Sequence, residues 1–323
     1  MSGARHRILL TGASGTLGRN VLELIGSRAD VQVLTLLRPE SRKLPTWPSV
    51  ESVRVDLLDR ATVRSVVVAF QPTCIVHCAA TGMEFPRTEW FDLIRFNVDL
   101  TVNLCECAAT IPDCHFIFVS TGLAYRQKTG DRPFLEDDPL DTQHPYGASK
   151  AAADLLVRSA AAEFAVPLTV LRPFSFTGLS DDRRRLFSAI LRAASGRVPI
   201  ELSAGTQVRD HCSARDIAAG IVLAMEAERQ DERGTHIYNL GSGCTDPLRT
   251  VIERVVAELD LGVALIFGAR EPGRFEPSFL VADIGRAVRS LGWVPKHNLS
   301  HAVWQLARES FPALSVREPQ EMA

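Results

Sequence analysis

The 323-residue chain has almost no excess of charge of either sign, because 36 Lys and Arg residues face 38 Asp and Glu residues. A basic surface for nucleic acid or an anionic membrane is therefore not expected. No apolar run approaches the ~18 residues of a membrane-spanning helix. The first residues carry only a short apolar stretch, unlike a signal peptide. These absences predict a cytoplasmic protein with no nucleic-acid and no membrane partner.

The seven cysteines form no C-x-x-C pair, and most of them stand inside apolar segments. Cysteine in such places behaves as a small buried hydrophobic residue. His77 and Cys78 lie near Cys74 in the sequence. On one predicted strand, however, they point to alternating faces and cannot converge on an ion. We predict no disulfide and no metal.

The first 170 residues alternate short apolar runs with longer helical patterns. Continuous apolar runs such as Phe116-Ile117-Phe118-Val119 are typical of parallel strands covered on both faces by helices. We predict strands at residues 7–11, 31–37, 52–55, 74–79, 115–120, 167–172 and 236–240. We predict helices at residues 16–27, 87–110, 146–164, 186–194, 214–228, 246–259 and 299–309. The fold class expected is α/β, a Rossmann-like doubly wound parallel sheet with a smaller, mostly C-terminal lobe.

A glycine-rich turn, Thr11-Gly12-Ala13-Ser14-Gly15-Thr16-Leu17-Gly18, joins the first predicted strand to the first helix. Glycine permits positive φ and a close approach of the backbone to a pyrophosphate, and the helix N-terminus presents free N–H groups to the anion. The spacing is G-x-x-G-x-x-G, not the usual G-x-G-x-x-G. A tight strand–helix connection without a ligand is the alternative. The strand before and the helix after favour a dinucleotide.

The second predicted strand ends at Leu37 and Arg38, where NAD-preferring sites carry a carboxylate for the ribose hydroxyls. No acid follows before Glu40, and Arg38 could pair with a 2′-phosphate. We therefore predict NADP(H), with NAD possible and a surface arginine as the alternative. Asp56 could accept the adenine amino group or cap the next helix, a role for which Asp59 competes.

Tyr146 and Lys150 open a predicted helix at positions i and i+4, so their side chains project from one face. A fixed cation near a phenol should lower its pKa from about 10 toward neutrality, which would make the tyrosine an acid or base. The strand at 115–120 ends at Ser120-Thr121. That is the sheet edge where ligands of α/β proteins bind, and Thr121 could orient a substrate oxygen there.

Together these motifs resemble the extended short-chain dehydrogenases/reductases, the family of NAD(P)-dependent nucleotide-sugar epimerases, dehydratases and reductases. Further matching motifs run along most of the chain: Asp56-Leu57, His77-Cys78-Ala79-Ala80, Asn97-Val98, Leu171-Arg172-Pro173-Phe174, Arg209-Asp210, Tyr238-Asn239-Leu240-Gly241 and Leu291-Gly292-Trp293. The resemblance implies that residues 1–172 and about 213–241 bind the dinucleotide. It also implies that about 173–212 and 242–323 form the substrate-binding lobe.

The resemblance implies three catalytic residues: Tyr146 moves the proton, Lys150 lowers its pKa and holds the nicotinamide ribose, and Thr121 binds the reacting oxygen. It implies a set of cofactor contacts: Gly12, Ser14, Gly15, Thr16, Leu17, Gly18, Arg38, Asp56, Leu57, Ala79, Ala80, Asn97, Tyr146, Lys150 and Pro173. The substrate contacts expected are Thr121, Ser175, Arg209 and Arg274. The run 183–185 (Arg-Arg-Arg) is interpreted as a solvated surface.

Departures from the family pattern narrow the chemistry. Gly122 and Leu123 stand where dehydratases carry an Asp-Glu pair, so dehydration is disfavoured. The favoured hypothesis is an NADP(H)-dependent reductase of a keto-deoxy sugar nucleotide. An NAD-dependent nucleotide-sugar 4-epimerase and a reductase of a non-sugar carbonyl remain open. A non-catalytic cofactor-sensing regulator is disfavoured by the Tyr–Lys pair. The apolar surface of the helices at 87–110 and 146–164 separately predicts a homodimer.

Overall fold

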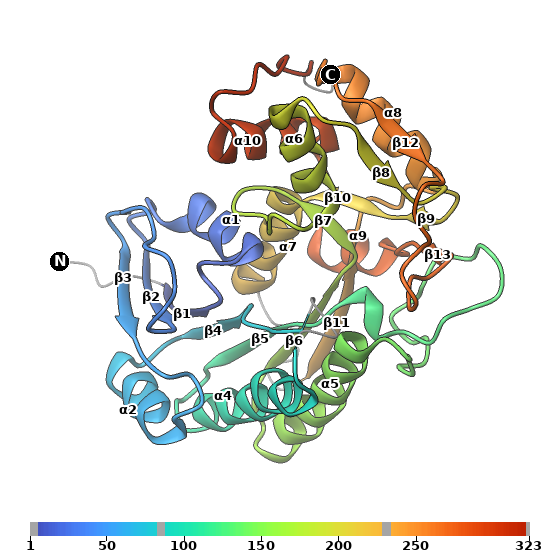
Figure 1. Cartoon of the computed structure of the whole chain (residues 1–323). Coiled ribbons are helices and arrows are strands. Elements are labelled where there is room, and N and C mark those ends of the chain that lie inside the picture. The colour runs from blue at the N-terminus through green and yellow to red at the C-terminus, as the bar shows by residue number, and fades with distance from the viewer. Residues whose placement is uncertain (1–5, 83–87, 228–233, 321–323) are drawn as a thin grey trace.

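The computed structural model describes residues 6–82, 88–227 and 234–320. Its central sheet is parallel, with seven strands in the order β3-β2-β1-β4-β5-β6-β11 (Figure 1). This is the 3-2-1-4-5-6 order of doubly wound dinucleotide folds, with β11 added beside β6. The strands are β1 His6–Thr11, β2 Val31–Leu37, β3 Val50–Arg54, β4 Cys74–His77, β5 His115–Val119, β6 Leu168–Pro173 and β11 Thr235–Leu240.

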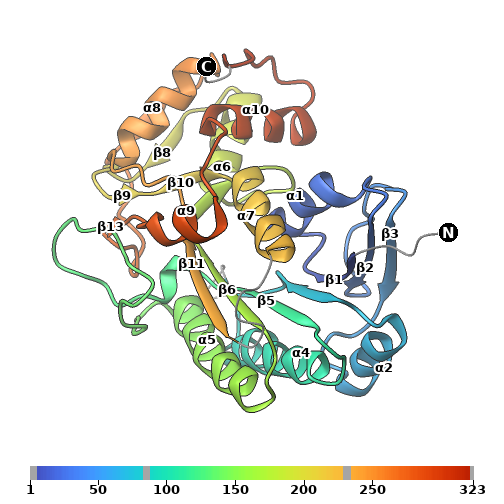
Figure 2. The ribbon, with the colours of Figure 1, turned by 180° about the vertical axis from the view of Figure 1, so that it is seen from behind.

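Helices cover both faces of the sheet, which confirms the predicted Rossmann-like α/β fold (Figure 1, Figure 2). On one face lie α1 Thr16–Ile25 and α7 Ala214–Glu226. On the other face lie α2 Arg60–Phe70, α4 Leu100–Ala108 and α5 Pro145–Glu163. Because both faces are covered, every residue of β5 is buried, as its continuous apolar run predicts.

A smaller lobe packs around its own apolar cluster, which includes Phe187, Ile252 and Leu306. Its helices are α6 Leu186–Gly196, α8 Leu248–Glu258 and α10 Leu299–Ser310. Its short parallel pairs are β7 Ser175–Thr177 with β10 His211–Ser213, β8 Ile200–Leu202 with β12 Leu265–Phe267, and β9 Val208–Arg209 with β13 Phe279–Leu280. The exact division of the chain between the two domains stays a prediction.

The helix predicted at 87–110 is wrong as one continuous element, and residue 87 lies outside the described residues. The described part of this region consists of α3 Trp90–Leu93, the π-helical segment η1 Ile94–Asp99 and α4. Two further helices, α2 and α9 Gly285–Leu291, were not expected. The predicted strand at 74–79 ends at His77, and residue 228 of the helix predicted at 214–228 is likewise not described.

The prediction that most cysteines behave as small buried residues is confirmed for five of the seven. The buried members are Cys74, Cys105, Cys107, Cys114 and Cys212. Within the described ranges no group of three or more His, Cys, Asp or Glu side chains could hold a metal ion. Within the same ranges, no helix is long and apolar enough to cross a membrane. The cytoplasmic location stays a prediction.

Candidate active site

The glycine-rich turn between β1 and α1 has the geometry that a phosphate loop needs. Gly12 adopts φ +74°, and a Cβ on it would lie 2.6 Å from the Ala79 nitrogen. A Cβ on Gly18 would lie 2.3 Å from the Gly12 oxygen. Gly15 precedes α1 without any side-chain cap, so the first N–H groups of the helix are not taken by a side chain. The loop therefore fits a bound pyrophosphate.

A segment of the lobe, residues 178–185, crosses this loop and is called here the cover segment. The Thr16 hydroxyl donates to Asp181 Oδ1 at 3.2 Å. Arg42 Nη2 donates to the Ser14 oxygen at 2.6 Å and to the Ser180 oxygen at 3.1 Å. Burial raises the pKa of Asp181. The cover segment is thus tied to the predicted phosphate-binding residues Ser14 and Thr16.

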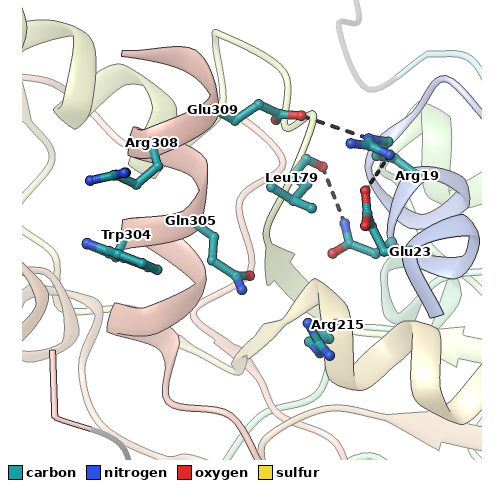
Figure 3. A pocket seen from close by; sticks show the side chains of 9 residues that line it. Arg19, Glu23, Leu179, Arg215, Trp304, Gln305, Arg308 and Glu309 are labelled. Atoms are coloured by element: carbon teal, nitrogen blue, oxygen red, sulfur yellow. Dashed lines mark hydrogen bonds and ion pairs between the residues drawn. The ribbon is translucent and has the colours of Figure 1, made fainter. Parts of the chain in front are cut away.

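A cavity of about 480 Å³ lies between α1, α7, α10 and the cover segment (Figure 3). Here Glu309 Oε2 accepts a hydrogen bond from the Ser180 N–H at 2.6 Å. Asn20 Nδ2 donates to the oxygens of Leu179 and Thr16 at 3.3 and 2.7 Å. Helices α1 and α10 therefore hold the cover segment from the side of this cavity.

At the predicted adenosine end, Arg38 is half exposed and its Nε lies 3.2 Å from Glu40 Oε1. Asp59, not Asp56, caps α2 by accepting from two backbone N–H groups. Asp56 instead accepts the Leu58 N–H at 2.9 Å. Leu57 is buried beneath this turn. The cofactor roles of Arg38, Asp56 and Leu57 stay predictions.

His77 connects the phosphate loop to α4. Its Nδ1 lies 2.7 Å from Thr11 Oγ1 and its Nε2 lies 3.0 Å from Thr101 Oγ1. Burial lowers the pKa of His77 well below its usual value. The Ala79 N–H donates to Thr11 Oγ1 at 3.3 Å, so this network fixes the loop in which Ala79 and Ala80 stand. His77 is therefore a structural residue.

Asn97, a predicted cofactor contact, is hydrogen-bonded to the loop after β4 and to α5. Asn97 is fully buried, and its Nδ2 donates to the Thr81 oxygen and to Ser149 Oγ, each at 2.8 Å. Its Oδ1 accepts the Thr81 N–H at 2.9 Å. Asn97 therefore holds the loop after β4 against α5, and its contact with the cofactor stays a prediction.

Tyr146 and Lys150 both lie buried on the first turns of α5. Lys150 Nζ lies 4.1 Å from the centre of the Phe118 ring at the carboxyl end of β5. It has no hydrogen-bond partner among the described residues. Burial lowers the pKa of Lys150 to about 7.

The expected lowering of the Tyr146 pKa is wrong for this structure. Burial raises the pKa of Tyr146 to about 12, and the charge that opposes this rise belongs to Arg185. The physical reason is that both groups are removed from water, which disfavours the phenolate and the ammonium alike. Tyr146 is therefore a protonated hydroxyl at neutral pH.

Two hydroxyl residues follow β5. Thr121 Oγ1 accepts the Leu123 N–H at 3.2 Å, at the start of the 3-10 turn η2 Gly122–Ala124. That bond leaves the Thr121 hydroxyl hydrogen free to donate. The neighbouring Ser120 Oγ is buried without a partner among the described residues, and it is not one of the predicted site residues. A Cβ on Gly122 would lie 2.9 Å from the Phe174 ring, so a larger residue there would require the ring to shift.

The interpretation of residues 183–185 as a solvated surface is wrong for Arg185. Its guanidinium stacks on the Phe176 ring at 4.5 Å, and its Nη1 bonds Asp181 Oδ1 at 2.8 Å. Burial, then the charges of Arg209 and Arg185, lower the pKa of His211 to about 3. The charges of both guanidinium groups therefore favour the uncharged form of one buried imidazole.

The predicted substrate residues lie around these groups. Ser175 pairs with His211 in the β7–β10 register. Arg209 Nη2 lies 3.1 Å from Glu276 Oε1, and its buried Nε has no partner in the described part of the chain. Arg274, two residues before Glu276, stacks on Phe275 at 5.1 Å. The substrate roles of Ser175, Arg209 and Arg274 stay predictions.

The model of the NAD dependent epimerase/dehydratase family matches residues 8–241, and the chain belongs to this family. It is an enzyme of the extended short-chain dehydrogenase/reductase type. It is 26% identical to a UDP-glucose 4-epimerase of Azospirillum brasilense, with 91% of this chain and 89% of that one covered. It is 24% identical to a dTDP-4-dehydro-6-deoxyglucose reductase of Escherichia coli, covering 95% of this chain and 98% of that one. A UDP-glucose 4-epimerase of Thermotoga maritima, solved with UDP-glucose, superposes with a TM-score of 0.82 at 20% identity, covering 95% and 99%.

Proposed function

We propose that this enzyme reduces the keto group of a deoxy sugar nucleotide with NADPH, and that Tyr146 is the proton donor. The observation that carries the proposal is the buried Lys150 ammonium, which has no hydrogen-bond partner among the described residues. A buried cation without partners costs free energy, so a site that keeps one favours a ligand with oxygen acceptors. The ribose of a nicotinamide nucleotide supplies such oxygens.

The residues present fit the dinucleotide. Gly12 and Gly18 lie where no Cβ fits, and the N-terminus of α1 faces the predicted pyrophosphate position. A bound nicotinamide supplies or accepts the hydride. Arg38 stands where an acid would select NAD, and its Nη atoms, which do not pair with Glu40, support the phosphorylated cofactor, NADP(H).

Proton transfer then follows from the state of each side chain. Tyr146 Oη carries its proton at neutral pH because burial raises its pKa to about 12, so it can give that proton to the carbonyl oxygen. The Thr121 hydroxyl hydrogen donates to the same oxygen, since Thr121 Oγ1 already accepts the Leu123 N–H. Lys150 binds the ribose hydroxyls, whose oxygens favour its charged form, and that charge stabilises the phenolate that remains.

Two arginines support an anionic substrate over a plain carbonyl compound. Arg185 and Arg209 both act on His211, whose imidazole is neutral and adds no charge of its own. Guanidinium groups bind phosphate oxygens through paired hydrogen bonds. We therefore propose that the substrate diphosphate binds beside Arg209, whose buried Nε has no partner among the described residues, and a reductase of a non-sugar carbonyl is disfavoured.

A second candidate, the NAD-dependent nucleotide-sugar 4-epimerase, is favoured by the relatives named UDP-glucose 4-epimerase. The two are separated by assaying the purified enzyme with NADPH and dTDP-4-dehydro-6-deoxyglucose, and separately with NAD and UDP-glucose. We expect NADPH to be consumed by the keto sugar. Conversion of UDP-glucose to UDP-galactose without net change in the cofactor would assign the epimerase instead.

We also propose a homodimer formed through α3, η1 and α5. Trp90, Phe91 and Ile94 are 59%, 66% and 55% exposed, and Leu155 and Leu156 on α5 are about half exposed. Apolar side chains gathered on neighbouring helices are typical of a subunit interface. A second copy of this chain covers such a surface by a two-fold axis.

A further inference from the structure

His144 precedes α5, the helix that carries Tyr146 and Lys150, and its ring proton is held on one particular nitrogen. It is the N-cap residue of α5, and its Nδ1 accepts the Gly147 N–H at 3.3 Å. A neutral imidazole has one nitrogen that accepts and one that donates. Because Nδ1 accepts, the ring hydrogen must be on Nε2. The helix cap therefore selects the tautomer.

The ring is also held in its neutral form. Burial, then the charge of Arg209, lowers the pKa of His144 below its ordinary value. Protonation would place a second hydrogen on Nδ1, opposite the Gly147 N–H, and would break the cap. At neutral pH His144 therefore presents one donor, the Nε2–H, and no charge.

The ring stands between the two parts of the proposed substrate site. It packs edge-on against Tyr146, with ring centres 6.3 Å apart, and against Phe275 at 6.2 Å. Phe275 precedes Glu276, the residue that binds Arg209. In the proposed binding mode Tyr146 contacts the reacting carbonyl and Arg209 contacts the diphosphate. The sugar that connects these two groups would then lie beside the His144 ring. Among the described residues its Nε2 has no hydrogen-bond partner.

We propose that His144 is a specificity-determining residue whose Nε2–H donates a hydrogen bond to an oxygen of the substrate sugar. The inference rests on the proposed function, since it takes Tyr146 and Arg209 as the two ends of a sugar nucleotide. A neutral N–H can donate to a hydroxyl oxygen of the sugar without adding charge to the site. A ring that acts only as a helix cap and packing surface is the alternative to be tested.

The His144→Asn variant separates the two roles. Asparagine is among the best N-cap residues, so the cap of α5 is kept. Its amide is shorter than the imidazole, so its N–H groups do not reach the position of Nε2 beside Tyr146. His144→Ala removes both cap and donor and serves as the control for helix stability, with a lower melting temperature expected.

The measurement is calorimetric binding of UDP, dTDP, UDP-glucose and dTDP-glucose to enzyme saturated with NADP⁺, using the nucleotide that the wild type prefers. For His144→Asn we expect unchanged affinity for the nucleoside diphosphate and about 3- to 10-fold weaker binding of its glucose conjugate, the effect of one hydrogen bond. Equal affinities of variant and wild type for the glucose conjugate overturn the inference. Equal losses for both ligands also overturn it, because a sugar contact cannot weaken a ligand without sugar. A wild type that binds none of the four probes overturns the proposed function itself.

Discussion

Replacement of Lys150 by methionine should stabilise the protein when no cofactor is bound. The substitution keeps an unbranched side chain and removes a buried cation that has no hydrogen-bond partner among the described residues. Burial lowers the pKa of Lys150 from 10.5 to about 7. Since one pKa unit corresponds to ~1.36 kcal/mol, burying the charged form costs at most ~5 kcal/mol. Relaxation and entering water reduce this cost, so we expect a gain of about 1–4 kcal/mol for Lys150→Met.

The pH dependence gives the sign of the effect. Below pH 7 the lysine is charged in both the folded and the unfolded chain, so the full cost is present. Between about pH 7 and 10.5 only the unfolded chain holds the proton, so wild-type stability rises with pH across this range. The advantage of Lys150→Met should therefore be largest near neutrality or below and shrink as the pH rises.

The assay is urea denaturation of the cofactor-free protein at about pH 6.5 and about pH 9. Lys128→Met is the matched control, because Lys128 Nζ lies 2.5 Å from Asp138 and the loss of a paired cation should destabilise. Despite its stability, Lys150→Met should bind NADPH more weakly than the wild type. A Lys150→Met protein less stable than the wild type at about pH 6.5 would refute this account of the buried ammonium.

Four further substitutions test other parts of the site and assembly. Gly18→Ala should weaken dinucleotide binding at least tenfold by fluorescence titration, because its Cβ would collide with the Gly12 oxygen; unchanged affinity would contradict the loop geometry. Arg38→Ala should remove a preference for NADPH over NADH of about 1–3 kcal/mol, and equal wild-type affinities would contradict that role. Thr121→Val should lower turnover by about 1–3 kcal/mol in barrier without weakening the cofactor, and unaltered turnover would exclude its hydrogen bond to the substrate. Phe91→Glu should turn a dimer into a monomer by light scattering, whereas a monomeric wild type would disprove the interface.

The central sheet could be predicted because each of its strands is specified locally. A strand buried on both faces, such as β5, needs a continuous apolar run, and such a run can be recognised in the sequence. The pairs β8–β12 and β9–β13 are only two or three residues long and join segments far apart in the chain. No local pattern specifies such pairs. Helix α2 was missed because it contains four valines, which are typical of strands.

The candidate site shows the same division. The positions of Tyr146 and Lys150 follow from their helical spacing, but their pKa values depend on burial by other segments. In the sequence Arg185 is one of three consecutive arginines and is expected to be exposed. The fold of the cover segment stacks its guanidinium on the Phe176 ring. The role of His144 depends on a bond to the Gly147 backbone and on Phe275, more than one hundred residues away. Contacts of this kind depend on how distant segments pack together, so no local sequence motif predicts them.

Proton transfer by Tyr146 is tested most directly by the single-turnover loss of NADPH absorbance on mixing the enzyme with dTDP-4-dehydro-6-deoxyglucose. Tyr146→Phe keeps the ring and removes the only atom that can donate the proton. The rate should fall about 10²- to 10⁴-fold, the usual contribution of general acid catalysis, while NADPH affinity stays nearly unchanged. A Tyr146→Phe enzyme that consumes NADPH at close to the wild-type rate would contradict the proposed chemistry.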